Sequence, residues 1–72
     1  MNRKMNRKII LDDIKPGFIY KEEEGWFLLI LKEVNKYEVI LYCLNKSRIV
    51  GFPILKKDIV NYINNKEIIY VK

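Results

Sequence analysis

The only thiol in the chain, Cys43, is the first residue whose chemistry has to be considered. The 72-residue sequence contains no His, so a Cys–His nucleophilic pair cannot form. One Cys also cannot form an internal disulfide. Cys43 falls inside an apolar run, where a free Cys behaves as a small buried hydrophobe. The pattern is typical of a structural residue in a reducing compartment.

The carboxylates offer no better candidates for catalysis. Glu22, Glu23 and Glu24 are consecutive, and adjacent side chains do not converge on a cation as the spaced ligands of a calcium loop do. We expect them to form a solvated loop. Neither a Gly-rich phosphate loop nor a cluster of metal ligands occurs in the sequence. We therefore expect a protein that is not an enzyme and that uses no cofactor and no metal.

The segment Trp26–Leu44 is the element around which the fold must be built. Its two apolar runs are rich in β-branched, aromatic and Leu residues, contain no Gly or Pro, and flank a polar turn. This composition fits a pleated, half-buried surface and predicts a long β-hairpin.

The register of this hairpin depends on the length of its turn. A two-residue loop at 35–36 places Glu33 opposite Glu38, which is unfavourable for like charges. A three-residue loop at 34–36 places Lys32 opposite Glu38 instead, and we favour this register because the charges are opposite.

Alternation along the two runs then predicts two groups of apolar side chains, one on each face. The first group is Phe27, Leu29, Leu31, Tyr37, Val39, Leu41 and Cys43; the second is Trp26, Leu28, Ile30, Ile40, Tyr42 and Leu44. An antiparallel sheet with one solvated face should alternate apolar and polar residues, which this hairpin does not. It must therefore be curled into a barrel, covered by another element, or paired with a second chain.

Shorter elements are predicted on both sides of the hairpin. Pro16 and Gly17 suit a type II turn that leads into a short strand at 18–21. A further strand is predicted at 48–52, ended by Pro53, and a terminal strand at 67–71. Between them, apolar residues at 55, 59, 62 and 63 recur at helical spacing and predict one or two amphipathic turns.

This order of elements, over residues 9–72, resembles the SH3-like small β-barrel superfold. The resemblance rests on the spacing of the segments 14–19, 26–44 and 49–71 and on no motif that selects one family. We expect a mainly β domain, either a small SH3-like barrel or a strongly curved antiparallel sheet of about five strands, with one short helix near the C-terminus. A dimer partner completing such a sheet is the alternative.

The net charge of +5 is concentrated in residues 1–8, which contribute +4 and leave +1 for the rest of the chain. These residues are a duplicated MNRK, which indicates either an upstream extension before Met5 or a basic, disordered N-terminal arm. Residues 9–72 form the single domain. No run approaches the ~20 apolar residues of a membrane span, and the N-terminus lacks the features of a signal peptide. We expect a cytoplasmic protein with no membrane contact.

Two binding functions fit these features. The first is a protein-binding module, such as an inhibitor or accessory protein of the kind that phages and mobile elements encode, which also allows a homodimer. Its candidate contact residues are the aromatic side chains that interfaces favour, namely Tyr20, Trp26, Tyr42 and Phe52.

The alternative function is nucleic-acid binding by a small barrel that stacks bases on aromatic residues. Its candidate residues are the basic ones of the arm and of the turn after the hairpin, namely Arg3, Lys4, Arg7, Lys8, Lys46 and Arg48. Because the domain itself is nearly neutral, whereas nucleic-acid domains usually present a basic face, we favour a protein target.

Overall fold

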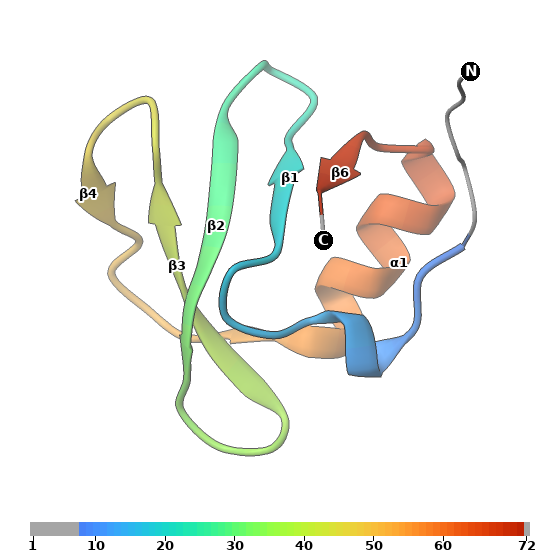
Figure 1. The fold of residues 1–72 in the computed structure, drawn as a ribbon, viewed down its shortest axis with the longest axis horizontal. Helices are drawn as coiled ribbons and strands as arrows, with labels where there is room; N and C mark the ends of the chain where they lie inside the picture. Colours follow the sequence, from blue (N-terminus) through green and yellow to red (C-terminus); the bar gives the residue numbers. More distant parts are fainter. Residues whose placement is uncertain (1–7, 72) are drawn as a thin grey trace.

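The computed structural model of the chain describes residues 8–71 as an antiparallel sheet with one helix (Figure 1). The basic arm predicted at 1–8 therefore lies outside the described residues, except for Lys8. The elements in chain order are η1 (Leu11–Asp13), β1 (Ile19–Lys21), β2 (Phe27–Glu33), β3 (Glu38–Cys43), β4 (Arg48–Ile49), β5 (Ile54–Leu55), α1 (Lys56–Lys66) and β6 (Tyr70–Val71).

The sheet has the strand order β4-β3-β2-β1-β6. On the side of β3 away from β2, β4 pairs with the end of β3 and β5 pairs with its start. Every pairing is antiparallel. The predicted mainly β class and the single helix near the C-terminus are confirmed. The sheet is not closed into a barrel, so it retains two faces and two edges.

The hairpin register differs from the one that we favoured. In the structure Leu28 lies opposite Cys43 and Ile30 opposite Leu41, and the pairing shifts by one residue around Leu31. The turn is held by Asn35, whose Oδ1 accepts the N–H groups of Tyr37 (2.8 Å) and Glu38 (3.0 Å). The predicted Lys32–Glu38 pair is therefore wrong: Lys32 lies opposite Ile40.

This register also regroups the side chains on the two faces of the hairpin. The predicted register placed Ile30 and Leu41 on different faces. In the structure they are paired and share a face, because directly paired residues project to the same side of a sheet. That face forms the core together with α1. The buried apolar cluster consists of Ile9, Ile14, Phe18, Tyr20, Ile30, Val39, Leu41, Ile59 and Ile63.

The first turn forms as predicted, and the helix lies where it was predicted but is longer than one or two turns: α1 has 11 residues. Ile59 and Ile63, four residues apart, are the buried residues of α1. The Phe18 N–H donates to the Lys15 carbonyl at 3.0 Å, with Gly17 at φ 98° between them, as a type II turn requires. The strand predicted at 48–52 is shorter than expected: β4 ends at Ile49, and Phe52 lies in the segment that connects β4 to β5.

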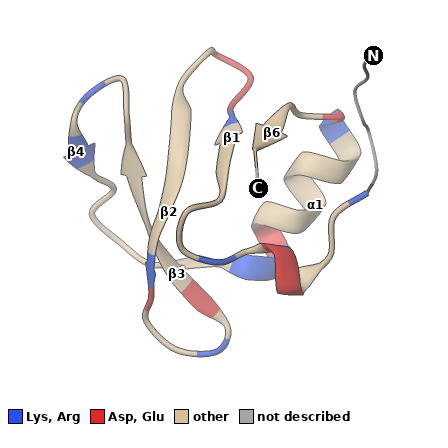
Figure 2. Cartoon of the chain, in the orientation of Figure 1, with Lys and Arg blue, Asp and Glu red and all other residues tan. Residues whose placement is uncertain are grey.

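Charge is separated at the end of the sheet opposite the hairpin turn (Figure 2). The β1–β2 loop carries Glu22, Glu23 and Glu24, whereas β4 and the turn before it carry Lys46 and Arg48. In Figure 1, α1 lies next to β6 and β1, and β3 and β4 extend away from it. The basic end of the sheet is thus not covered by the helix.

Candidate functional site

One row of apolar side chains crosses the whole sheet on the face opposite the core. Ile19 lies opposite both Leu29 and Val71, Leu29 lies opposite Tyr42, and Tyr42 lies opposite Ile49. Alternation places these residues on the other side from Tyr20, Ile30, Leu41 and Cys43, which are buried. The row spans all five strands from β4 to β6.

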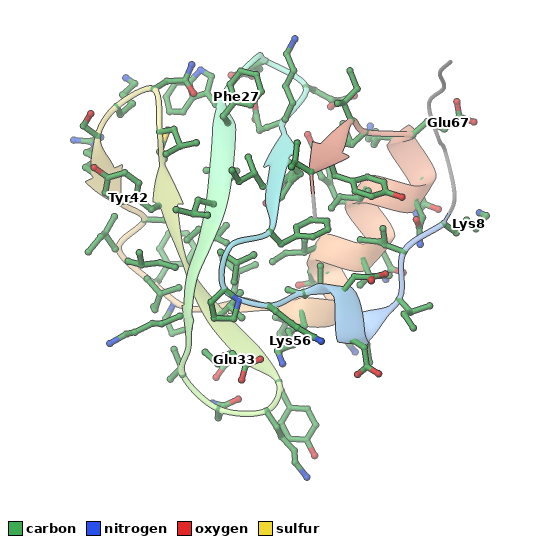
Figure 3. The ribbon with its side chains drawn as sticks, in the orientation of Figure 1. Lys8, Phe27, Glu33, Tyr42, Lys56 and Glu67 are labelled. Atoms are coloured by element: carbon green, nitrogen blue, oxygen red, sulfur yellow. The ribbon has the colours of Figure 1, made fainter. Side chains whose placement is uncertain are left out.

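Further apolar side chains flank this row. Alternation along β2 and β3 adds Phe27, Leu31 and Ile40 to the same side. We call the complete set the outer face: Ile19, Phe27, Leu29, Leu31, Ile40, Tyr42, Ile49 and Val71. None of these residues packs against the buried cluster, and Ile49 and Val71 remain 55% and 59% exposed. Phe27 and Tyr42 lie on the strands well away from α1 (Figure 3).

The charged groups among these side chains are mainly cationic. Lys21 pairs with Phe27 across the sheet, and its Nζ lies 5.8 Å from the centre of that ring. Lys32 pairs with Ile40. The acid at the end of this face, Glu38, accepts a hydrogen bond from Asn35 Nδ2 at 2.9 Å within the turn. The outer face therefore presents apolar groups together with two lysines.

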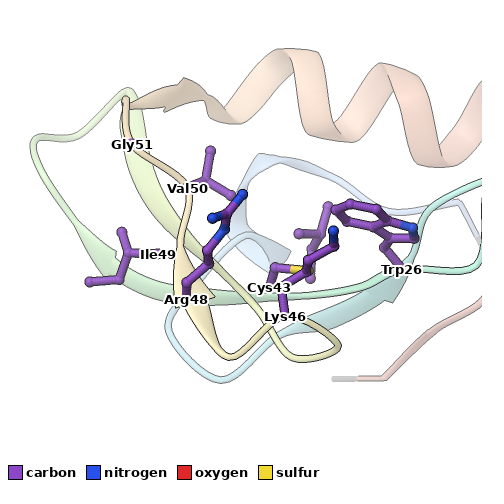
Figure 4. A pocket seen from close by; sticks show the side chains of 8 residues that line it. Trp26, Cys43, Lys46, Arg48, Ile49, Val50 and Gly51 are labelled. Atoms are coloured by element: carbon purple, nitrogen blue, oxygen red, sulfur yellow. The ribbon is translucent and has the colours of Figure 1, made fainter.

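A cleft of about 400 Å³ lies on the opposite side of the sheet, the side on which α1 lies (Figure 4). Leu28, Cys43 and Arg48 are directly paired across β2, β3 and β4 and so share this side. Trp26 precedes Leu28 by two residues. We call this hollow the Trp26 cleft; it is lined by Trp26, Leu28, Cys43, Lys46, Arg48, Ile49, Val50 and Gly51.

The Trp26 cleft combines an indole with two cations. Lys46 Nζ lies 4.5 Å from the centre of the Trp26 ring, a cation–π contact worth about 0.5–1 kcal/mol at an exposed site. The lining contains no acidic side chain. Within residues 8–71, neither Lys46 nor Arg48 forms an ion pair. Both positive charges are therefore available to an anion.

Local hydrogen bonds hold the turn that carries Lys46 against the start of β2. Asn45 Oδ1 accepts the Phe27 N–H at 2.6 Å, and the Leu44 N–H donates to the Phe27 carbonyl at 2.9 Å. Ser47 adopts a left-handed conformation with φ 55°, which reverses the chain into β4. The turn thus places Lys46 beside Trp26, twenty positions earlier in the chain.

Tyr20 is a correction to the predicted contact residues. Its side chain is 5% exposed and lies in the core, with its ring edge-on to Tyr62 at 6.2 Å between centroids. Burial raises the pKa of Tyr20 well above the ordinary value, and the nearby Tyr62 and Glu22 raise it further. A ring held in this position cannot contact a partner on the surface.

The other predicted residues lie at three separate places. Tyr42 belongs to the outer face, whereas Trp26, Lys46 and Arg48 meet in the Trp26 cleft. Phe52 is 61% exposed but lies outside both. The remaining predicted basic residues are Lys8, which is exposed, and Arg3, Lys4 and Arg7, which lie outside the described residues.

Sequence reasoning did not single out the aliphatic members of the row across the outer face. Ile19, Leu29 and Ile49 are ordinary strand residues, and only the register shows that they form one row with Tyr42. The sequence nevertheless indicated that an apolar face exists, because the hairpin has too few polar residues for a solvated face.

The thiol and the carboxylates form no metal site in the part of the chain that the structure describes. Cys43 is 4% exposed. Residues 8–71 bring together no group of three or more carboxylate or thiol side chains that could hold a metal ion. Nor is any helix among them long and apolar enough to cross a bilayer.

Comparison with known proteins adds no relative. No protein-family model, no curated protein and no solved structure matches this chain.

Proposed function

We propose that the protein is a non-catalytic binding module that docks a partner protein on its outer face. The observation that supports the proposal is the apolar row from Ile49 through Tyr42, Leu29 and Ile19 to Val71. Large exposed apolar patches on small proteins mark interaction sites. An aromatic residue within the patch, here Tyr42 beside the central Leu29, is the kind of side chain that dominates binding energy.

The size of the face suits an interface of ordinary dimensions. The chain extends 35 and 26 Å along its two longer axes, and Figure 1 shows the strands spread across this view. A standard interface buries roughly 800 Å² on each partner. The outer face spans the five strands from β4 to β6, which make up part of this extent, and can supply much of such an area.

The charges on the face favour an acidic partner over a second copy of the chain. Lys21 and Lys32 stand among the apolar side chains and outnumber the carboxylate of Glu38 at the end of this face. A face-to-face dimer would bring together two surfaces of the same sign. A partner with apolar residues bordered by Asp or Glu would complement both properties.

This proposal includes the role and location expected from the sequence. A small domain that covers an apolar and acidic surface of another protein would act as an inhibitor or accessory protein, as phage and mobile-element proteins do. The lone thiol at Cys43 is compatible with the reducing cytoplasm.

The test is a selection of ligands from a displayed library of protein fragments, using the full chain as bait. Recovered fragments are purified and their dissociation constants measured by calorimetry. We expect apolar fragments rich in Asp and Glu, which bind the Leu29→Asp and Ile49→Asp variants at least tenfold more weakly. Phe52→Asp is the matched control, because it also places an acid at an exposed apolar position but lies outside the outer face.

Circular dichroism establishes that each variant is folded, and light scattering measures its mass. Of the two outer-face positions, Ile49 tolerates substitution better than Leu29, because it lies at a sheet edge and is 55% exposed. Fragments that bind both outer-face variants as tightly as the unaltered chain would disprove the proposal. A stable dimer that Ile49→Asp converts to a monomer would also disprove it, because the occupant would then be a second copy.

A further inference from the structure

We infer that the Trp26 cleft binds a nucleotide, either free or as one unit of a single strand. This site lies on the opposite side of the sheet from the outer face and shares with it only Ile49, on the edge strand β4. The inference therefore does not rest on the proposed function, and Leu29→Asp is the outer-face variant that leaves the cleft lining unchanged. The inference rests on three features that meet in one hollow: an indole ring, two cations and an apolar floor.

The first feature is the flat surface of Trp26. The ring is 38% exposed and borders a hollow of about 400 Å³, within the range of small-molecule sites. Leu28 and the buried Cys43 lie across the sheet from each other and supply an apolar floor. Any of the nucleobases can stack on an aromatic ring in this setting, because each has a flat π-face.

The second feature is the pair of cations at the mouth of the cleft. Lys46 lies over the Trp26 ring, and the Arg48 side chain projects into the same hollow from β4 (Figure 4). Lys46 now occupies the ring face that a base would take. A nucleotide replaces this contact by its base and offers its phosphate to the displaced ammonium group, so the Trp26 ring and the Lys46 charge each exchange one partner for another.

The guanidinium group of Arg48 suits a phosphate and a carboxylate alike, so the indole has to decide between them. The planar fork of the guanidinium group matches two oxygens of either anion. A carboxylate peptide would also meet the two charges, but its backbone offers no flat group to the indole. The aromatic ring and the cations together therefore favour a nucleotide.

The test measures binding to the full chain by calorimetry with three probes: adenosine monophosphate, a mixed-sequence single-stranded DNA octamer, and an octamer of Glu. Fluorescence of Trp26, the one Trp in the sequence, provides a second signal. We expect saturable binding of the nucleotide or the DNA, quenched fluorescence, and an affinity that falls with salt. Lys46→Ala and Arg48→Ala should each weaken this binding at least fivefold.

Lys36→Ala is the matched control, because Lys36 Nζ also lies over an aromatic ring, 5.9 Å from that of Tyr37, but outside the cleft. It should leave the affinity unchanged. DNA binding that is tighter than mononucleotide binding, with the same dependence on Arg48, would identify a single strand as the source. Equal affinities would identify a free nucleotide.

Three results would overturn the inference. The first is the absence of binding by both nucleotide probes. The second is a loss of affinity in Lys36→Ala equal to that in Arg48→Ala, which would indicate attraction by net charge alone. The third is binding of the Glu octamer as tightly as the DNA, which would identify an acidic peptide as the ligand.

Discussion

Asn64 on α1 forms two reciprocal hydrogen bonds with the backbone of Ile9. The Ile9 N–H donates to Asn64 Oδ1, and Asn64 Nδ2 donates to the Ile9 carbonyl, each at 2.9 Å. Both bonds are partly buried and join residues 55 positions apart. They fix the start of the domain against the last turn of the helix, where Ile9 enters the core.

We expect Asn64→Ala to lower the free energy of unfolding by about 1–3 kcal/mol, because it leaves a partly buried N–H and carbonyl without partners. Urea denaturation followed by circular dichroism measures the change. Asn65→Ala is the control for helix propensity, since Asn65 is exposed on the same helix. Equal effects of the two substitutions would show that the side-chain bonds to Ile9 contribute nothing.

The buried hydroxyl of Tyr20 should make the protein sensitive to alkaline pH. Burial raises the pKa of Tyr20 above its unfolded value, so the folded state retains a proton that the unfolded state loses above about pH 10. The stability contribution is complete below that pH and decreases as the pH rises further, by about 1.4 kcal/mol per pH unit.

Tyr20→Phe should abolish this additional loss while preserving the fold, because the aromatic ring remains in the core. The measurement is the difference in unfolding free energy between the variant and the unaltered chain from pH 7 to 11. Tyr37→Phe, at a position 66% exposed, is the control. Parallel curves for the unaltered chain and Tyr20→Phe would contradict the prediction.

The elements of the fold could be predicted from residue type, but the faces of the sheet could not. Composition located the hairpin, and helical spacing located α1. The register depends on the shift around Leu31 and on the Asn35 turn, and a displacement of one residue exchanges the faces of a strand. The charge pair that guided our choice contributes too little to outweigh burial of Ile30 and Leu41.

The candidate sites could be predicted only in part, because their assembly also depends on the register of the strands. Ile19 and Tyr20 are both apolar, so the sequence did not indicate which of them faces the core. Trp26 and Arg48 were assigned to different functions and came together only once the pairing of Cys43 with both neighbouring strands was known. The resemblance to SH3-like barrels stays a prediction, because no solved structure matches.

Glu67, at the end of α1, adopts an unfavourable backbone conformation for its residue type. Its φ and ψ are 53° and 46°, and its N–H donates to the Ile63 carbonyl. Gly is the usual residue at such a left-handed cap, and an acid at this end opposes the helix dipole. We expect Glu67→Gly to raise the unfolding free energy by about 1 kcal/mol.

Glu67→Lys separates the two contributions, because it reverses the charge and keeps the side chain. Thermal unfolding should rank Gly above Lys and Lys above Glu, with Lys gaining about 0.3–1 kcal/mol from the dipole. A larger gain from Lys than from Gly would show that charge, rather than backbone conformation, limits the stability of this helix end.

Gly17 and Gly51 provide a matched pair for testing the effect of backbone conformation on a Gly→Ala substitution. A Cβ added at either position meets no atom within 4 Å, but only Gly17 has a positive φ, of 98°. The Gly17 N–H also donates to the Ile30 carbonyl at 3.0 Å, so the turn aligns β1 with β2.

We expect Gly17→Ala to cost about 1–3 kcal/mol, whereas Gly51→Ala should be neutral or stabilise by up to about 1 kcal/mol through the unfolded chain. Urea denaturation of both variants checks the difference. If Gly17→Ala were as stable as Gly51→Ala, the turn could adopt another conformation without disturbing the sheet, and the order of β1 next to β2 would have to be specified by core packing alone.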